Sequence, residues 1–348
     1  DGTEKMEEQE KRSMKKILII NTGGTFSSVK SAGGLTPGLG EHDILEELKV
    51  VAKDCQLEYE DFCSLDSANI MPRHWAELAA RIEEASREYS GIVVIHGTDT
   101  MSYTASMLSF MLWGVPVPVV ITGSQLSIAH PVADAMENCR AAIHMANSRC
   151  PGVFVAFNRR ILLGVRASKV RTMSFDAFDS INYPDVGEIN AFGMRIHREL
   201  IPRRTAVRFL ADTSYSPKVM VVKPAPGTPP EIFDAMVNLG CRGIVVEAFG
   251  LGGLPFEEND LCGAVKRTVE KGVAVAIGSQ CRYDGSSLSV YETGRRALEA
   301  GAMEMYDMTT EAAVTKLMWL LGKDLTMEEL REKFGENLVN EVSPRDGQ

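Results

Sequence analysis

Short, unbroken apolar segments alternate with amphipathic segments along this sequence, and no other feature constrains the fold as strongly. Four apolar segments occur in the first half of the chain, at 17–21, 92–95, 118–121 and 153–157. A strand that is buried on both faces has no polar side, so it forms a continuous apolar run. Such strands separated by helical segments predict βα units around a largely parallel sheet.

The segments between these strands have helical spacing. The clearest covers 72–87, where Pro72 suits the first helical turn and apolar residues recur every three or four positions. These residues are Trp75, Leu78, Ala79, Ile82 and Ala85. The most apolar stretch, 105–121, is interrupted by Gly114, Pro116 and Pro118. We therefore expect it to be a buried helix followed by a buried strand, not a membrane span.

The periodicity is lost over 198–217 and then starts again. Strands are expected at 218–222, 243–247 and 273–277, and helices at 232–239, at 260–271 and after Thr293. The predicted fold is therefore an α/β chain of two domains. A larger N-terminal domain over 14–197 has a mostly parallel sheet flanked by helices, and a linker over 198–217 leads to a smaller α/β domain over 218–348. Residues 1–13 are expected to be a disordered extension.

Composition excludes several classes of function. The chain has 37 basic and 47 acidic residues, a formal net charge of -10, which disfavours a broad phosphate-binding surface. Its seven cysteines are scattered without a CxxC pair, and its six histidines form no ligand motif, so we expect no metal. The cysteine pattern and the charged N-terminus, which has no apolar signal core, predict a cytoplasmic protein without nucleic-acid or membrane partners.

Two glycine–threonine turns follow predicted strands. The first is TGGT, at 22–25, and it precedes a glycine-rich stretch that we interpret as a mobile flap. The second is HGTDT, at 96–100. A lone threonine after a strand is usually a helix cap, but parallel strands present their carboxyl ends at one ligand-binding edge. Two hydroxyl-bearing turns and a carboxylate therefore indicate a site there, while the lack of GxGxxG or Walker sequences gives little support for phosphate binding.

These two turns resemble the signature motifs of the bacterial-type L-asparaginases. The similarity extends over nearly the whole chain from Lys15, and the segments around Lys169 and Cys281 favour the type I, cytosolic branch. The further matching segments are DSANIMPRHW (66–75), ITGSQ (121–125), GVRASKV (164–170), FDAFDSIN (175–182), GSQC (278–281) and AAVTKL (312–317).

The resemblance implies an amidohydrolase that converts L-asparagine to L-aspartate and ammonia, with minor action on L-glutamine. Thr25 matches the nucleophile that forms a β-aspartyl ester, and Thr98, Asp99 and Lys169 match the other catalytic residues. A threonine hydroxyl is a weak nucleophile and needs a nearby base or a strong local field. Whether Lys169 acts as a neutral base or as a cation stays open from the sequence.

Substrate-binding residues are implied in the same way. Asp66 and Ser67 match residues that hold the amino and carboxylate ends of the substrate, and backbone near Gly97 and Ser124 lines the site in relatives. Without the resemblance, Asp66 and Ser67 could equally be helix caps and Lys169 a solvated surface lysine. The family implies no cofactor and a homodimer or homotetramer.

The sequence departs from the family pattern at three positions. Leu35 stands where many relatives have a flap tyrosine, and Ala68 replaces a polar residue after Ser67. Some type I enzymes have an arginine of an allosteric asparagine site where this chain has Glu247. Because this change reverses the charge offered to a carboxylate, we predict no allosteric site of that design.

Two alternatives remain. The amide-hydrolysing component of archaeal glutamyl-tRNA amidotransferase, its D subunit, shares these motifs, but it usually has an extra module before the first turn, and here 21 residues precede Thr22. The negative net charge also disfavours a tRNA partner. The other alternative is a catalytically idle relative that binds amino acids, against which the retention of Thr25, Thr98, Asp99 and Lys169 argues.

Overall fold

The chain folds into two compact units in the computed structural model, which describes residues 14–24, 28–31, 34–37, 48, 52, 55–203 and 208–344. The first unit comprises Asp1–Asp179 and Asp185–Asp212, and the second Ser180–Pro184 and Thr213–Gln348. The change of unit after Asp212 falls inside the stretch 198–217, of which 204–207 lie outside the described residues. The extension expected at 1–13 also lies outside them.

An eight-stranded sheet forms the centre of the first unit, in the order β12-β11-β8-β7-β6-β5-β1-β4. The five strands from β7 to β4 are parallel, and the other three add antiparallel pairs at the opposite edge. The strands are β1 (Lys15–Gly23), β4 (Cys55–Leu65), β5 (Gly91–Ile95), β6 (Pro118–Thr122), β7 (Gly152–Phe157), β8 (Arg160–Leu163), β11 (Gly187–Asn190) and β12 (Gly193–Ile196). The expectation of a mostly parallel sheet is confirmed.

Strand β1 lies between β4 and β5, and this position explains its sequence. Ile17 pairs with Leu57 on one side and Gly91 on the other, and 17–23 are all buried. Strand β4 was not predicted, because it forms the sheet edge and most of its residues are partly exposed, so it has no apolar run.

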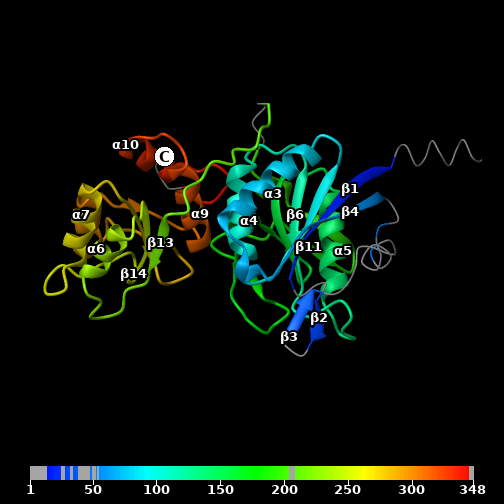
Figure 1. Ribbon diagram of the computed structural model, residues 1–348, viewed down its shortest axis with the longest axis horizontal. Coiled ribbons are helices and arrows are strands. Elements are labelled where there is room, and N and C mark those ends of the chain that lie inside the picture. The colour runs from blue at the N-terminus through cyan, green and yellow to red at the C-terminus, as the bar shows by residue number, and fades with distance from the viewer. Residues whose placement is uncertain are drawn as a thin grey trace, which may run out of the picture. The chain divides into compact units, whose positions relative to one another are not determined.

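Helices cover the two faces of this sheet, with α4 and α5 on opposite sides of the strands (Figure 1). The helices are α3 (Pro72–Ala85), α4 (Met101–Met111) and α5 (Ala135–Ala146). In α3 the five predicted apolar residues are the buried ones, as the spacing requires. The stretch 105–121 is the second half of α4 followed by β6, as expected, and no described helix is long and apolar enough to span a membrane.

Short elements complete the first unit. A hairpin pairs β2 with β3, and a second small sheet pairs β9 with β10. These elements and the short 3₁₀ helices are β2 (Ser28–Ser31), β3 (Gly34–Pro37), β9 (Ala167–Lys169), β10 (Phe178–Ser180), η2 (Ser67–Asn69), η3 (Gly164–Arg166) and η4 (Arg198–Leu200). The hairpin occupies part of the stretch interpreted from its glycines as a flap.

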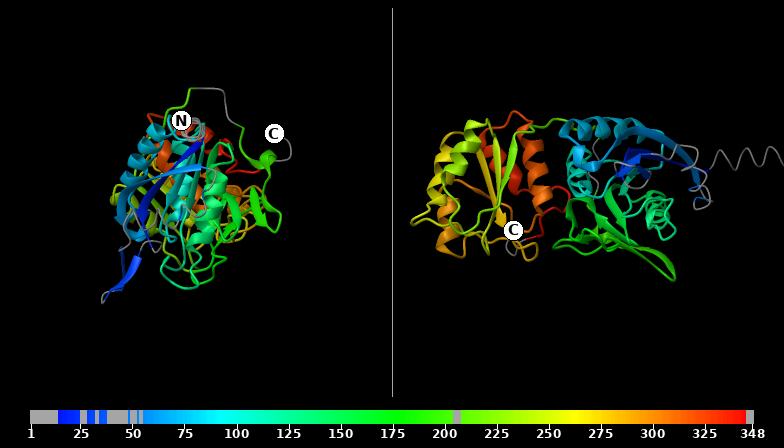
Figure 2. Two further views of the ribbon diagram at one scale, coloured as in Figure 1. Left: turned by 90° about the vertical axis from the view of Figure 1, so that its right-hand side faces the viewer. Right: turned by 60° about the horizontal axis from the view of Figure 1, so that its bottom comes forward.

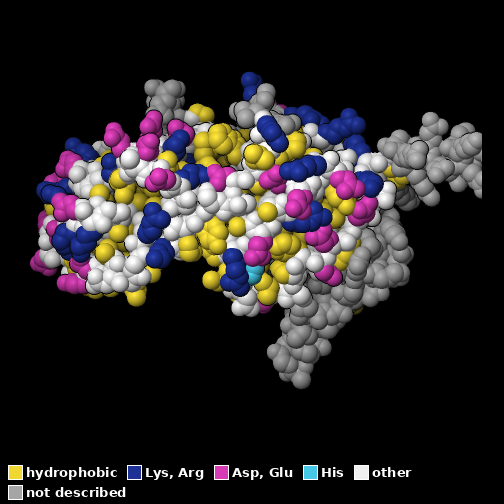
Figure 3. Space-filling model, turned by 45° about the horizontal axis from the view of Figure 1, so that its top comes forward, with side chains coloured by type: hydrophobic (Ala, Val, Ile, Leu, Met, Phe, Trp, Pro, Cys, Tyr) yellow, Lys and Arg dark blue, Asp and Glu magenta, His cyan; other side chains and the backbone are white. Residues whose placement is uncertain are grey.

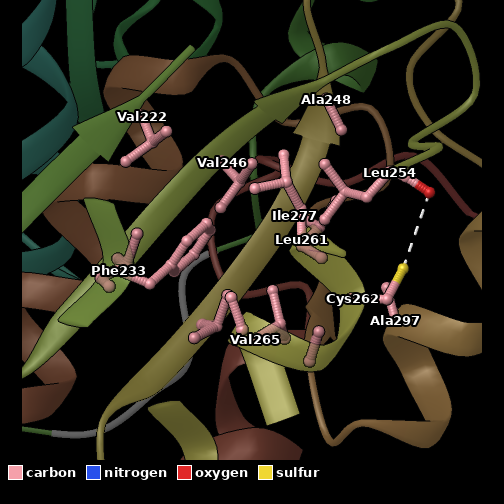
Figure 4. Close-up of a cluster of buried hydrophobic side chains, with 14 of the residues drawn as sticks. Val222, Phe233, Val246, Ala248, Leu254, Leu261, Cys262, Val265, Ile277 and Ala297 are labelled. Carbon is pink, nitrogen blue, oxygen red and sulfur yellow. Dashed lines mark hydrogen bonds between the residues drawn. The ribbon is translucent and has the colours of Figure 1, made fainter. Parts of the chain in front are cut away.

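The second unit is a four-stranded parallel sheet in the order β13-β14-β15-β16, lying between α6 and α7 on one side and α9 on the other (Figure 2). Its core packs Phe233 of α6, Val246 of β14 and Val265 of α7, and the Cys262 thiol donates to Leu254 O (Figure 4). The elements are β13 (Val219–Val222), α6 (Glu231–Asn238), β14 (Gly243–Ala248), α7 (Leu261–Glu270), β15 (Ala274–Ser279), α8 (Glu292–Glu299), β16 (Met303–Glu304), α9 (Thr310–Leu321) and α10 (Met327–Gly335). This smaller α/β unit is confirmed.

Candidate active site

The turn after β1 is built by its own polar side chains. Asn21 Oδ1 accepts from Gly23 N at 3.1 Å, and Thr22 Oγ1 donates to Ile95 O at the end of β5 across 2.9 Å. Gly23 and Gly24 have φ angles of +100° and +88°, a region that disfavours other residues. This explains the TGGT sequence up to Gly24. Thr25, the predicted nucleophile, lies outside the described residues.

Three turns meet closely at the carboxyl end of the sheet. A Cβ added to Gly24 would lie 2.5 Å from Gly97 Cα, and one added to Gly97 would lie 2.7 Å from Ser67 Oγ. Gly97 therefore fits between the turn after β1 and the start of η2, and a side chain at either glycine would displace a neighbour. The prediction that the two glycine–threonine turns lie at one edge is confirmed by these contacts.

Lys169, at the end of β9, contacts both predicted partners in the second turn. Its Nζ donates to Thr98 Oγ1 at 2.8 Å and to Asp99 Oδ1 at 2.6 Å. The Lys169 side chain is only 16% exposed, whereas that of Asp99 is 66% exposed. Lys169 is therefore not a solvated surface lysine. The exposed carboxylate of Asp99 faces solvent, from which a ligand would approach.

A buried series of hydrogen bonds connects helices α3 and α4 to the turn that follows β5. Trp75 Nε1 donates to Thr104 Oγ1 at 2.9 Å, and the same hydroxyl lies 2.9 Å from His96 Nε2. His96 Nδ1 lies 2.6 Å from Gly97 O. Burial lowers the pKa of His96 to about 4, so its ring is neutral at pH 7.

The directions of these bonds follow from the groups involved. The indole N–H of Trp75 only donates, so the Thr104 hydroxyl gives its proton to His96 Nε2. The proton of the neutral imidazole is then on Nδ1 and is donated to Gly97 O. This series of hydrogen bonds holds the Gly97 carbonyl in place, next to Thr98.

The turn after β6 packs against the end of β5. A Cβ on Gly123 would lie 2.2 Å from His96 O, and Ser124 beside it is buried. The Ser124 hydroxyl has no hydrogen-bond partner within the described part of the chain. The next residue, Gln125, accepts a hydrogen bond from Thr98 Oγ1 at 3.4 Å. The structure thus brings Ser124 and Thr98 into one region, as expected.

Asp66 and Ser67 have local structural roles at this edge. Asp66 Oδ1 accepts from Ala68 N at 2.8 Å and caps η2, while Ser67 is buried and its carbonyl accepts from Thr100 Oγ1 at 2.7 Å. The helix-cap interpretation therefore holds for Asp66. Ser67 also packs against Gly97, so Asp66 and Ser67 both lie next to the second turn. That these two residues bind a substrate stays a prediction.

The other two departures from the family pattern, after Ala68 in η2, can also be located. Leu35 lies on β3, paired with Lys30 across the β2–β3 hairpin. Glu247, on β14 of the second unit, accepts from Thr310 Oγ1 at 2.6 Å and pairs with Lys223 at 3.6 Å. Its carboxylate is therefore engaged by neighbours of the same unit, and the absence of an allosteric asparagine site stays a prediction.

The described part of the chain contains no group of three or more His, Cys, Asp or Glu side chains placed to hold a metal ion. What this region offers is two hydroxyl-bearing turns, a lysine, an exposed carboxylate and buried backbone. Such a set suits proton transfer and nucleophilic attack on a small polar molecule.

Sequence reasoning missed two contributors to this region. Thr104 lies inside α4, where its spacing marks it only as a buried helical residue. Gln125 was quoted within ITGSQ without a role, and its contact with Thr98 depends on strands 27 positions apart meeting in space. Adjacency of β5 and β6 would have been the only signal for it.

Comparison with known proteins gives family matches for both units. Residues 16–202 match the family model described as Asparaginase, N-terminal, and residues 218–334 match the Glutaminase/Asparaginase C-terminal domain.

Individual proteins are similar over most of the chain. It is 40% identical to an L-asparaginase of Thermococcus kodakarensis, over 94% of this chain and 99% of that protein. It is 36% identical to the D subunit of the glutamyl-tRNA(Gln) amidotransferase from Pyrococcus abyssi, over 96% of this chain and 78% of that relative. The solved structure of the thermostable L-asparaginase from T. kodakarensis aligns with a TM-score of 0.89 and 39% identity, covering 95% of this chain and all of that one.

Proposed function

The chain belongs to the asparaginase family, and on that premise we propose that it is an amidohydrolase converting L-asparagine to L-aspartate and ammonia. The observation that carries the proposal is the contact of Lys169 Nζ with both Thr98 and Asp99 at the carboxyl end of β5. The similarity to an L-asparaginase over nearly the full length of both chains supports the same substrate.

In the proposed reaction the Thr25 hydroxyl attacks the side-chain amide carbon of asparagine. The Thr25 proton is lost, the carbon–nitrogen bond breaks, and the nitrogen takes up a proton and leaves as ammonia. The product of this step is a β-aspartyl ester on Thr25, which water then hydrolyses to aspartate and free enzyme. Dividing the reaction in this way replaces one difficult step by two easier ones.

Thr98, Asp99 and Lys169 serve these proton movements. Their separations of 2.8 Å and 2.6 Å are within the range in which a proton passes directly between heavy atoms. Charge develops on the amide oxygen during attack, and backbone N–H groups beside Thr98 are our candidates for stabilising it. The Gly97 carbonyl, held by His96, fixes the plane of the peptide that carries the Thr98 N–H.

Free asparagine is a small zwitterion, and the proposed binding residues complement it. The exposed carboxylates of Asp99 and Asp66 suit its ammonium group, and the Ser67 hydroxyl suits its carboxylate. Gly97 and Ser124 supply the walls of the same region. Glutamine differs by one methylene, which supports only a modest preference, so we include weak action on L-glutamine.

Amide hydrolysis within a tRNA-dependent amidotransferase is the second candidate, favoured by the 36% identity to the P. abyssi protein. The net charge of -10 weighs against it, because a tRNA partner is polyanionic. On the face drawn in Figure 3, acidic side chains lie among the basic ones over much of the surface.

A homodimer or homotetramer in the cytoplasm is also proposed for this chain. The oligomer comes from the family resemblance, and the compartment from the cysteine pattern. All seven cysteines are free thiols, and five of them are buried, as expected for small apolar core residues.

The test is ammonia release by the purified chain from free L-asparagine and free L-glutamine, with Thr25→Ala as the inactive control. We expect turnover of asparagine, slower turnover of glutamine, and loss of both in the variant. Failure to release ammonia from either free amino acid would refute the proposal. Turnover only in the presence of a tRNA-bound partner would favour the second candidate.

A further inference from the structure

The side-chain amide of Gln125 connects Thr98 to the loop that follows Lys169. Gln125 lies three residues after β6, next to the end of β5, and its Oε1 is 3.4 Å from Thr98 Oγ1. On its other side, Gln125 Nε2 contacts the carbonyls of Thr172 at 3.2 Å and Ser174 at 2.9 Å. One amide therefore contacts the two chain segments that provide Thr98 and Lys169.

The orientation of this amide is determined by its partners. Backbone carbonyls only accept hydrogen bonds, so the NH₂ group must face Thr172 and Ser174. The Gln125 oxygen must then face Thr98, because a flipped amide would place oxygen against two carbonyl oxygens. An oxygen fixed in this way can only accept.

The direction of the Thr98 hydroxyl proton follows. When Lys169 is charged, its Nζ only donates, and it uses a lone pair of Thr98 Oγ1 at 2.8 Å. The Thr98 proton is then available to an acceptor, and Gln125 Oε1 is one at 3.4 Å. The order of donation runs from Lys169 to Thr98 to Gln125.

The backbone of Gln125 is held as firmly as its side chain. Gln125 N donates to both oxygens of Asp134, at 3.1 and 3.0 Å, and Leu126 N donates to Oδ1 at 3.1 Å. Asp134 also accepts from Asn138 Nδ2 at 3.0 Å, and both of these side chains belong to buried residues. Gln125 is thus anchored to the start of α5, which limits its movement.

We propose that Gln125 is a positioning residue for amide hydrolysis, which directs the Thr98 hydroxyl proton away from Lys169. The proposal rests on the function proposed above for this site. With the proton on the Gln125 side, a lone pair of Thr98 stays directed at Lys169 before the substrate arrives. Such preorganisation spares the reaction the cost of reorienting the hydroxyl. Gln125 acts through Thr98 and is given no contact with the substrate.

Two substitutions separate this role from simple anchoring of the loop. Gln125→Met has a similar length but no acceptor oxygen and no donor. Gln125→Glu keeps an oxygen towards Thr98 but turns a second, negatively charged oxygen towards the carbonyls of Thr172 and Ser174. If the oxygen towards Thr98 matters, Gln125→Met lowers kcat about tenfold, the effect of losing one hydrogen bond, and Gln125→Glu loses less kcat than Gln125→Met despite its repulsion from the two carbonyls. KM for asparagine stays within about twofold in both variants.

Several results would overturn the proposal. These are a wild-type kcat in Gln125→Met, equal losses in both variants, or a change confined to KM. Equal losses would assign Gln125 to holding the loop, because neither variant can donate to Thr172 and Ser174. Melting temperatures of both variants, measured alongside, report the contribution of the lost loop contacts to stability.

A crystal structure of each variant gives a readout that does not depend on activity. In Gln125→Met we expect the Thr98 side chain to rotate about χ1 towards another acceptor, which moves Thr98 Oγ1 away from Lys169 Nζ. In Gln125→Glu we expect the contact between these two atoms to be kept. An unchanged contact in Gln125→Met would overturn the proposal. If the wild type failed to hydrolyse asparagine, the proposed function would fall, while these structures would still decide whether Gln125 orients Thr98.

Discussion

The Lys169 ammonium nitrogen lies 2.6 Å from Asp99 Oδ1, although 70 positions separate the two residues in the chain. Lys169 ends the short strand β9, and Asp99 follows β5, so the contact exists only because the fold brings these two ends together. The lysine is mostly buried and the aspartate is mostly exposed. The pair therefore combines a mostly buried lysine with a carboxylate that a substrate can reach.

Replacing Asp99 by Asn tests whether this pair serves catalysis or stability. Because the Asp99 carboxylate is 66% exposed, water screens its pair with Lys169 and the pair contributes little to stability, so we expect the melting temperature to stay within a few degrees of the wild type. We expect kcat to fall by about tenfold or more and KM for asparagine to rise, because proton transfer and ammonium binding both lose the carboxylate. Steady-state ammonia release measures both constants.

Asp234→Asn is the matched control, since Asp234 pairs with Lys271 at 2.9 Å in the second unit. Its kinetic constants should equal those of the wild type. Equal kinetic effects of the two substitutions would contradict a special role for Asp99.

The sequence predicts the buried part of this fold well and its edges poorly. The runs that became β1, β5, β6 and β7 are apolar because both faces of these strands are covered, and that covering is visible in the sequence. Edge strand β4 has the sequence CQLEYEDFCSL, whose polar residues conceal its pairing with β1.

Gly24→Ala tests the close approach of the two turns. The new Cβ would lie 2.5 Å from Gly97 Cα, and Gly24 has a φ of +88°. The left-handed conformation alone costs about 1–2 kcal/mol, and the backbone clash adds to it. We therefore expect the free energy of unfolding, measured with urea, to fall by more than about 2 kcal/mol in Gly24→Ala. We also expect kcat to fall.

Gly114→Ala separates the two contributions. Gly114 has a φ of +83°, but an added Cβ meets nothing within 4 Å. The free energy of unfolding of Gly114→Ala should therefore fall by only about 1–2 kcal/mol, and the variant should keep full activity. If the two variants lost the same stability and activity, the contact between the turns would be unimportant.

Thr104→Val removes the central hydroxyl of the buried series of hydrogen bonds under the second turn. Trp75 Nε1 and His96 Nε2 both lose their partner. Two unsatisfied buried groups cost about 2 kcal/mol or more, so the free energy of unfolding should fall by that amount. Thr104→Ser keeps the hydroxyl and should recover most of the loss. If Thr104→Val were as stable as Thr104→Ser, the hydrogen bonds of Thr104 with Trp75 and His96 would not contribute to stability.

The pKa of about 4 for His96 predicts a pH dependence of stability. A histidine in the unfolded chain has a pKa near 6.5. Between pH 6.5 and about 4, His96 is therefore protonated in the unfolded state and neutral in the folded state. This contribution is fully present above pH 6.5 and is lost as the pH falls to about 4, by about 3 kcal/mol in total.

Urea unfolding between pH 4 and pH 7 measures this loss, and His96→Gln is the control. The wild type should lose about 3 kcal/mol more than the variant over this range, because carboxylates contribute alike to both. If the free energy of unfolding fell equally with pH in the wild type and in His96→Gln, His96 would not be the titrating group.

The sequence identified the candidate residues of the site but not the residues that hold them in place. The motifs named Thr98, Asp99 and Lys169, and the structure brings Lys169 within hydrogen-bonding distance of the other two, while their catalytic roles stay a prediction. Gln125 and Thr104 could not be identified in this way. Their roles depend on single hydrogen bonds between side chains of different elements, which leave no periodic trace in the sequence.

Ammonia release by Lys169→Met, compared with Lys271→Met, tests the central claim most directly. Lys271 also donates to a carboxylate, Asp234, but in the second unit. The account predicts that kcat on L-asparagine falls by roughly 100-fold or more in Lys169→Met, as for loss of a proton-transfer group, while Lys271→Met matches the wild type. Wild-type turnover in Lys169→Met would contradict the account.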